Sequence, residues 1–110
     1  MACTLDKDFY QLPEGDQTII GQKGIDLEYE VRLRINLARA LYANPNILIV
    51  DDLFAHMEHD RRMKIFKSVF LDQFKFRTRI LVCHHREVLE YADKVVCLSE
   101  GEIFATGTFD

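Results

Sequence analysis

Two carboxylates follow a short apolar run and are the side chains of this sequence best placed for chemistry. Asp51 and Asp52 come directly after residues 47–50, which are branched, apolar and interrupted by no polar residue. Such a run is typical of a central strand in a parallel sheet that is covered on both faces. Ligands of these sheets bind beyond the carboxyl ends of the strands. The pattern therefore predicts a buried strand that presents Asp51 and Asp52 to a binding site.

An apolar strand that ends in Asp is also half of the phosphate-binding apparatus of P-loop nucleotidases, in which the Asp helps to hold Mg²⁺. The other half is a glycine-rich loop followed by Lys and Ser or Thr. These 110 residues contain no such loop, since Gly15, Gly21 and Gly24 are not followed by that pair. The sequence therefore predicts one half of a phosphate site.

The composition sets the outer limits of the function. A chain of 110 residues with a net charge of -4 fits one modest domain and has no basic field for nucleic acid. The short basic cluster Arg61-Arg62 is interpreted as solvated charge. From the first twenty residues and the lengths of the apolar runs, the chain is expected to carry no secretory signal and no membrane span. The three cysteines, Cys3, Cys83 and Cys97, are interpreted as buried, reduced thiols.

Apolar periodicity and breaker residues predict an α/β chain. The first 26 residues are expected to be irregular, and the last strand should fold back as a hairpin. Strands, helices and short links alternate in the order of a parallel sheet, finished by an antiparallel edge. The expected helices are 28–42, 57–70 with Met63, Phe66 and Phe70 on one face, and 87–91; the expected strands are 47–50, 79–83, 94–98 and 103–106.

Several motifs, in order and at family spacing, resemble the second half of an ATP-binding cassette domain of the multidrug-resistance-associated and cystic-fibrosis-regulator branch. The matching stretches are 12–25 before the signature loop, 37–42 in the signature helix, 47–52 in the Walker B strand, 79–84 in the switch-histidine strand, and 99–108 in the closing hairpin. The resemblance implies a partial P-loop NTPase fold without its N-terminal half. It divides the chain into a lead-in (1–26), a degenerate signature loop and helix (27–46), Walker B and D-loop (47–60), and the switch-histidine and hairpin region (61–110).

The resemblance also assigns roles to three side chains. Asp51 takes the position that holds Mg²⁺, Asp52 the position of the catalytic Glu, and His84 that of the switch histidine that contacts the γ-phosphate, while His85 is treated as incidental. Because Asp is one methylene shorter than Glu, slow or absent hydrolysis is expected. The plainer alternatives are that Asp51 caps the next turn and that His84 is only a polar strand end.

The signature loop departs from the family pattern. Leu-Ser-Gly-Gly-Gln is replaced by Leu27 followed by Glu28, Tyr29, Glu30 and Val31. In the family this helix start binds the γ-phosphate of ATP held by the opposite domain. Each Glu carboxylate at about 4 Å from a phosphate oxygen would oppose binding by about 4 kcal/mol at an effective dielectric near 20. These four residues are therefore predicted to form a cofactor-binding loop that has lost its ligand. Tyr29 could stack on an adenine or serve only as a packing residue.

The resemblance implies a parent protein that couples ATP and Mg²⁺ binding and hydrolysis to export, on the cytoplasmic side of a membrane. Its partners would be the missing P-loop half or another nucleotide-binding domain, and a membrane-spanning domain, but no nucleic acid. The isolated chain is expected to lack ATPase activity and to bind neither cofactor productively. The alternative is a non-enzymatic module that binds and modulates a transporter domain. A zinc site at His56 and His59 is disfavoured, because no Cys partner or second spaced pair accompanies them.

Overall fold

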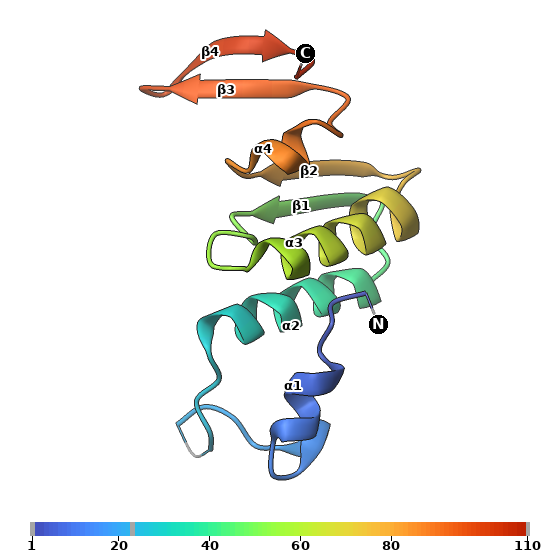
Figure 1. The fold of residues 1–110 in the computed structure, drawn as a ribbon, viewed down its shortest axis with the longest axis vertical. Helices are drawn as coiled ribbons and strands as arrows, with labels where there is room; N and C mark the ends of the chain where they lie inside the picture. Colours follow the sequence, from blue (N-terminus) through green and yellow to red (C-terminus); the bar gives the residue numbers. More distant parts are fainter. Residues whose placement is uncertain (1, 23, 110) are drawn as a thin grey trace.

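A computed structural model describes residues 2–22 and 24–109 as an elongated α/β chain (Figure 1). Two helical layers lie on one side of a short parallel strand pair, and a separate hairpin ends the molecule. The elements are α1 (Asp6–Gln11), the 3₁₀ turn η1 (Gly15–Gln17), α2 (Tyr29–Tyr42), β1 (Ile47–Asp51), α3 (His59–Phe66), the π-helical segment η2 (Lys67–Gln73), β2 (Thr78–Val82), α4 (Arg86–Leu89), β3 (Val95–Ser99) and β4 (Glu102–Gly107).

The helix α2 matches its prediction closely. Its residues Val31, Arg34 and Leu37 are buried and recur every third position, so they share one face. The helix ends where Asn44 adopts a left-handed backbone with φ 54°, a conformation that Asn tolerates better than most residues, and Pro45 follows. The breaker residues therefore fix the loop that leads into β1.

The predicted second helix begins at His59 and changes its winding partway. After Phe66 the chain widens into η2, where the backbone N–H of Phe74 donates to the carbonyl of Val69 at 2.9 Å, five residues back. Predicted core residues Phe66 and Phe70 are both buried. The widening is a π-helical feature that apolar spacing alone does not reveal.

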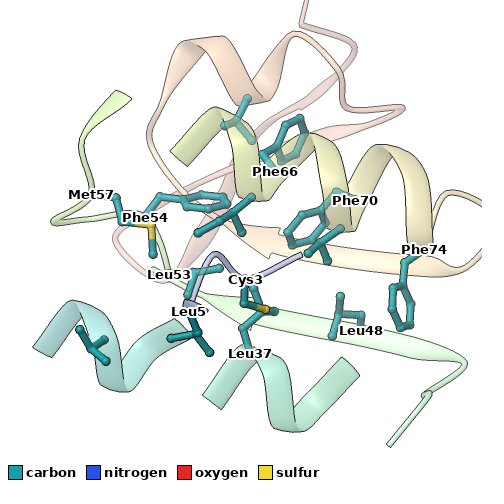
Figure 2. Packing of buried hydrophobic residues seen from close by; sticks show 14 residues of the cluster. Cys3, Leu5, Leu37, Leu48, Leu53, Phe54, Met57, Phe66, Phe70 and Phe74 are labelled. Carbon is teal, nitrogen blue, oxygen red and sulfur yellow. The ribbon is translucent and has the colours of Figure 1, made fainter. Parts of the chain in front are cut away.

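The core lies between the helices and one face of the strand pair. Phe54, Phe66 and Phe70 form an aromatic cluster, with Phe66 and Phe70 stacked at a centroid distance of 5.4 Å and Phe54 edge-on to both at 6.4 Å (Figure 2). Leu37 from α2 and Leu48 from β1 face this cluster in the same layer. The core thus joins α2, β1, α3 and η2 into one packed unit.

The strand pair corrects the prediction of a sheet covered on both faces. β1 and β2 pair in parallel, with Ile47 opposite Thr78 and Asp51 opposite Val82. Leu48 is 2% exposed, whereas Ile49 on the opposite face is 68% exposed and Ile80 is 50% exposed. Side chains alternate between faces along a strand, so an apolar run places residues on both. Among the described residues, helices cover only one of the two faces.

The hairpin corrects the prediction of one continuous sheet. β3 pairs only with β4 among the described residues, antiparallel and with an irregularity between Cys97 and Leu98. In Figure 1 the turn containing α4 lies between β2 and β3, and the two strands are not hydrogen-bonded neighbours. Both hairpin strands are largely exposed, including Phe104 at 79%. The part of the chain that the structure describes therefore forms two separate two-stranded sheets.

The overall dimensions agree with this incomplete packing. The radius of gyration is 15.8 Å and the extents are 47 × 31 × 25 Å. A compact domain of this length has a radius of gyration of about 13 Å. The lead-in also differs from its prediction, because residues expected to be irregular include helix α1.

Candidate functional site

Asp51 and Asp52 lie at the carboxyl edge of the parallel pair, as predicted. Asp51 is the last residue of β1 and stands opposite Val82, the last residue of β2. The Asp52 backbone N–H donates to the Val82 carbonyl at 3.0 Å, and Asp52 adopts a left-handed backbone with φ 52°. Asp tolerates this conformation because its short polar side chain can bond locally. Both carboxylates are exposed, so they are free to meet a ligand at this edge.

The two histidines follow β2 at the same edge but have different surroundings. Their rings lie 4.4 Å apart and are tilted by 32°. His84 is exposed, whereas His85 is half-buried and its Nε2 is a buried atom without a hydrogen-bond partner among the described residues. Burial, then the charges of Arg62 and His84, lower the pKa of His85. The histidine that was treated as incidental is thus the one embedded in the structure.

An ion cluster beside this edge was missed by the sequence analysis. Arg62 donates from Nη2 and Nε to Glu87 Oε1 at 2.7 and 3.0 Å and from Nη1 to the Met57 carbonyl at 2.9 Å. His59 Nδ1 lies 3.4 Å from the same carboxylate oxygen. A hydrogen bond from its own backbone N–H, together with Arg62, lowers the pKa of Glu87 to about 2.

This cluster joins the first turn of α3, and the Met57 carbonyl just before it, to the start of α4, which follows the histidines. The interpretation of Arg61-Arg62 as solvated charge is wrong for Arg62, whose side chain is 11% exposed. The two partners Arg62 and Glu87 are 25 residues apart in the chain. No local pattern connects residues at that separation.

The four residues of the degenerate signature loop do not form one surface. Glu28 is exposed at the N-cap of α2 and makes no capping hydrogen bond with its side chain. Tyr29 meets the ring of His56 edge-on, at a centroid distance of 5.6 Å and an angle of 73°. Val31 points into the core. Tyr29 thus contacts the segment after β1 but is itself 54% exposed, and its stacking on an adenine stays a prediction.

Glu30 corrects the electrostatic argument made for this loop. Its Oε1 lies 2.5 Å from Arg61 Nη1 and 3.4 Å from Arg34 Nε. An opposite charge at such a distance offsets the field of the carboxylate, so Glu30 is not the bare repulsive charge that the estimate assumed. Only Glu28 keeps the exposed position required by that estimate.

Zn²⁺ and Mg²⁺ require different sets of ligands. The described residues contain no group of three or more His, Cys, Asp or Glu side chains arranged to hold a metal ion. Mg²⁺ is different, because proteins bind it through one or two carboxylates together with substrate phosphates and water. The exposed carboxylate of Asp51 fits that donor set if phosphates come from a ligand.

The comparisons with known proteins agree with the motif order. An ABC-type transporter of Zymoseptoria tritici is 35% identical over 108 residues, which are 98% of this chain and 8% of the relative. ABC transporter C family member 5 of Arabidopsis thaliana is 38% identical over 109 residues, 99% of this chain and 7% of the relative. ABC transporter C family member 8 of Dictyostelium discoideum is 39% identical over 112 residues, again 99% and 7%. No family model matches the chain.

Matches that cover nearly the whole chain define its class as a segment of an ABC transporter protein. The Arabidopsis and Dictyostelium relatives narrow this class further, because both are named as C family members. The chain belongs to the C family, the multidrug-resistance-associated branch, and spans only 7 to 8% of the curated relatives that it matches. Within the described residues, no helix has both the length and the apolar composition needed to cross a membrane.

Proposed function

We propose that this chain is the Walker B and switch-histidine part of an ATP-binding cassette domain with a P-loop NTPase fold. The observation that carries the proposal is the shared edge of β1 and β2, where Asp51, Asp52 and His84 follow paired strand ends. In a complete domain on the cytoplasmic side of a membrane, Asp51 would help to hold Mg²⁺ against ATP phosphates. Asp52 would orient the attacking water, and His84 would contact the γ-phosphate.

A P-loop half, from the same polypeptide or another, would complete the fold. Ile47 and Ile49 of β1 and Ile80 and Val82 of β2 are exposed, and together they form the uncovered face of the parallel pair. Covering apolar surface yields roughly 25 cal/mol per Å². The uncovered face therefore favours the proposal that a second structural layer packs against these strands.

A cavity beside β2 is a second observation that favours a P-loop half as the missing partner. Its volume is about 240 Å³, and it lies between η2, β2, α4 and the start of β3. Apolar side chains from η2, β2 and α4 line it, among them Phe70, Leu81 and Val88. The outer edge of β2 has no strand partner among the described residues. Unpaired strand edges are ready to bond another strand.

The isolated 110-residue chain should not hydrolyse ATP. Phosphoryl transfer needs the phosphate cradle, its Lys and a held Mg²⁺ together. The test is to join this chain to the P-loop half of an Arabidopsis C family relative and to measure ATP binding and phosphate release. We expect ATP binding only in the chimera, and weaker Mg²⁺-dependent binding after Asp51→Asn. Phosphate release by the isolated chain that disappears in Asp51→Ala would overturn the proposal.

The uncovered face also favours a second candidate, a non-enzymatic module that binds and modulates a transporter domain. Exposed apolar faces of this kind mark interaction sites as well as missing layers. Reading the coding sequence upstream of residue 1 separates the two candidates. An in-frame P-loop favours the ATP-binding domain, and its absence favours the module.

A further inference from the structure

Arg62 connects two segments that lie beside the carboxyl edge of the β1–β2 pair. Its Nη1 donates to the Met57 carbonyl at 2.9 Å, and its Nε and Nη2 donate to Glu87 Oε1 at 3.0 and 2.7 Å. The guanidinium group is planar and presents its N–H donors in a fixed geometry. One side chain therefore sets the distance between the turn after β1 and the first turn of α4.

Both ends of this Arg62 bridge are attached to buried backbone. Met57 is 5% exposed, and its backbone N–H donates at 3.2 Å to the carbonyl of Phe54, which is fully buried. At the other end Val88 follows Glu87, is 3% exposed, and donates its backbone N–H to the His85 carbonyl at 3.0 Å. A shift at either end of the bridge would therefore move a packed segment and not only a side chain.

His84 has few contacts of its own to fix its position. It lies between the end of β2 and the start of α4, and its backbone makes no hydrogen bond to other backbone groups among the described residues. The helix α4 has four residues, and His85 at its N-cap makes no side-chain capping hydrogen bond. A helix this short is not stable through its own hydrogen bonds. The position of His84 thus depends on what holds the start of α4.

Arg62 is the stronger of the two partners that meet Glu87. Its side chain is 11% exposed, whereas His59 is 63% exposed and its Nδ1 lies 3.4 Å from the same carboxylate oxygen. A guanidinium group is always charged, and an imidazole is charged only when it is protonated. The hold on Glu87 is therefore assigned to Arg62.

We propose that Arg62 is a positioning residue for His84. By holding Glu87 at a fixed distance from the Met57 carbonyl, it orients the segment between β2 and α4 and sets where His84 stands relative to Asp51 and Asp52. The inference rests on the proposed function only for the use made of His84, whose imidazole would be presented to the terminal phosphate. The bridge itself is a property of the 110-residue chain.

The test uses the full 110-residue chain without nucleotide. Hydrogen exchange with mass spectrometry follows backbone protection in peptides 53–58 and 83–90, and exchange at the imidazole carbon reports the surroundings of His84. We expect Arg62→Ala to raise backbone exchange in both peptides by about tenfold, because charge-assisted hydrogen bonds are lost at both ends. It should also change the imidazole exchange of His84. Glu87→Gln, which keeps the side-chain shape, should raise exchange mainly in 83–90.

Interchanging the two charged partners separates the two arms of the bridge. Arg62→Glu combined with Glu87→Arg restores an ion pair between α3 and α4 but leaves the Met57 carbonyl without its donor. Backbone exchange in 83–90 and imidazole exchange of His84 should therefore return toward the values of the unchanged chain. Backbone exchange in 53–58 should stay raised.

Val69→Ala is the matched control, because Val69 is fully buried in η2 and is no part of the bridge. It should raise exchange over α2 as well, without a selective effect on 83–90 or His84. The proposal is overturned if Arg62→Ala raises exchange over α2 as much as over 83–90, if it leaves His84 unchanged, or if the interchanged variant restores neither 83–90 nor His84. Because no nucleotide or P-loop half takes part, failure here leaves the proposed function standing, and failure of the chimera leaves the bridge standing.

Discussion

The two faces of the β1–β2 pair share a backbone but have opposite surroundings. Leu48 faces a core built from α2, α3 and η2, whereas Ile49, the next residue, faces solvent. The hairpin β3–β4 continues the exposed region, since neither of its strands contributes a buried residue. The comparison shows that a strand can carry apolar residues on both faces even when the described residues cover only one of them. One half of the molecule is a packed unit and the other half is an unpartnered surface.

Removing one aromatic ring from each half should give the largest contrast. Phe54→Ala opens a cavity in the aromatic cluster and should lower the free energy of unfolding by about 3–5 kcal/mol. Phe104→Ala removes the same ring from the exposed hairpin and should change it by less than about 0.5 kcal/mol. Urea unfolding of both variants measures the difference. Equal losses would mean that the hairpin packs as part of the core.

Self-association should originate on the uncovered face. The exposed apolar side chains of β1 and β2 predict oligomers or aggregates in sedimentation experiments. Ile49→Lys and Val82→Lys should raise the monomer fraction, because they place a charge on that face. Tyr42→Lys, an exposed position at the end of α2, is the matched control and should have little effect. A monodisperse monomer with a sharp two-state melt would show instead that the fold is complete without a further layer.

The Glu87 cluster should make the packed half sensitive to acid. The pKa of Glu87 in the folded chain is lowered from 4.5 to about 2, so folding stabilises the ionised carboxylate relative to the protonated one. The stability from this group is fully present above about 4.5 and is lost as the pH falls toward about 2. Thermal unfolding across this range should show a smaller acid-induced loss in Glu87→Gln than in the unchanged chain. Glu100→Gln, at the exposed hairpin turn, should retain the full loss.

Thiol labelling should separate the halves with the least disturbance to stability. Cys97 on the hairpin is exposed, which corrects the prediction that the cysteines are buried, whereas Cys3 is buried and Cys83 partly so. Burial raises the pKa of the Cys3 and Cys83 thiols and leaves less of the reactive thiolate. Alkylation followed by mass spectrometry should therefore modify Cys97 first and Cys3 last. Rapid labelling of Cys3 would indicate that the N-terminal segment opens easily.

Local sequence patterns predicted where helices and strands lie better than they predicted which segments pack against or pair with them. The breaker at Asn44 and Pro45 marked the end of α2, and the apolar run marked β1 to within one residue. The same run could not indicate that its second face lacks a covering layer, because that depends on other chain segments. Nor could spacing predict the separation of β3 from β2.

The candidate site divides in the same way. The positions of Asp51, Asp52 and His84 at one sheet edge follow from parallel strand order, so motif spacing was sufficient to predict them. The ion pairs of Arg34 with Asp8 and of Arg62 with Glu87 join residues 26 and 25 positions apart. Such pairs depend on tertiary packing and leave no periodic signal. The charge on Glu30 was visible in the sequence, but its compensation by Arg61 was not.

The β1–β2 pair is parallel and the β3–β4 pair is antiparallel, and this difference has a mechanical consequence. In the hairpin, Val95 at the start of β3 is paired with Gly107 at the end of β4, so tension along the polypeptide would pull at one end and separate the hydrogen bonds one after another. In the parallel pair, β1 begins at Ile47 and β2 ends at Val82, at opposite ends of the pair, so the same tension would load its hydrogen bonds together in shear. Stretched between its termini, the molecule should release the hairpin at low force before the parallel pair ruptures.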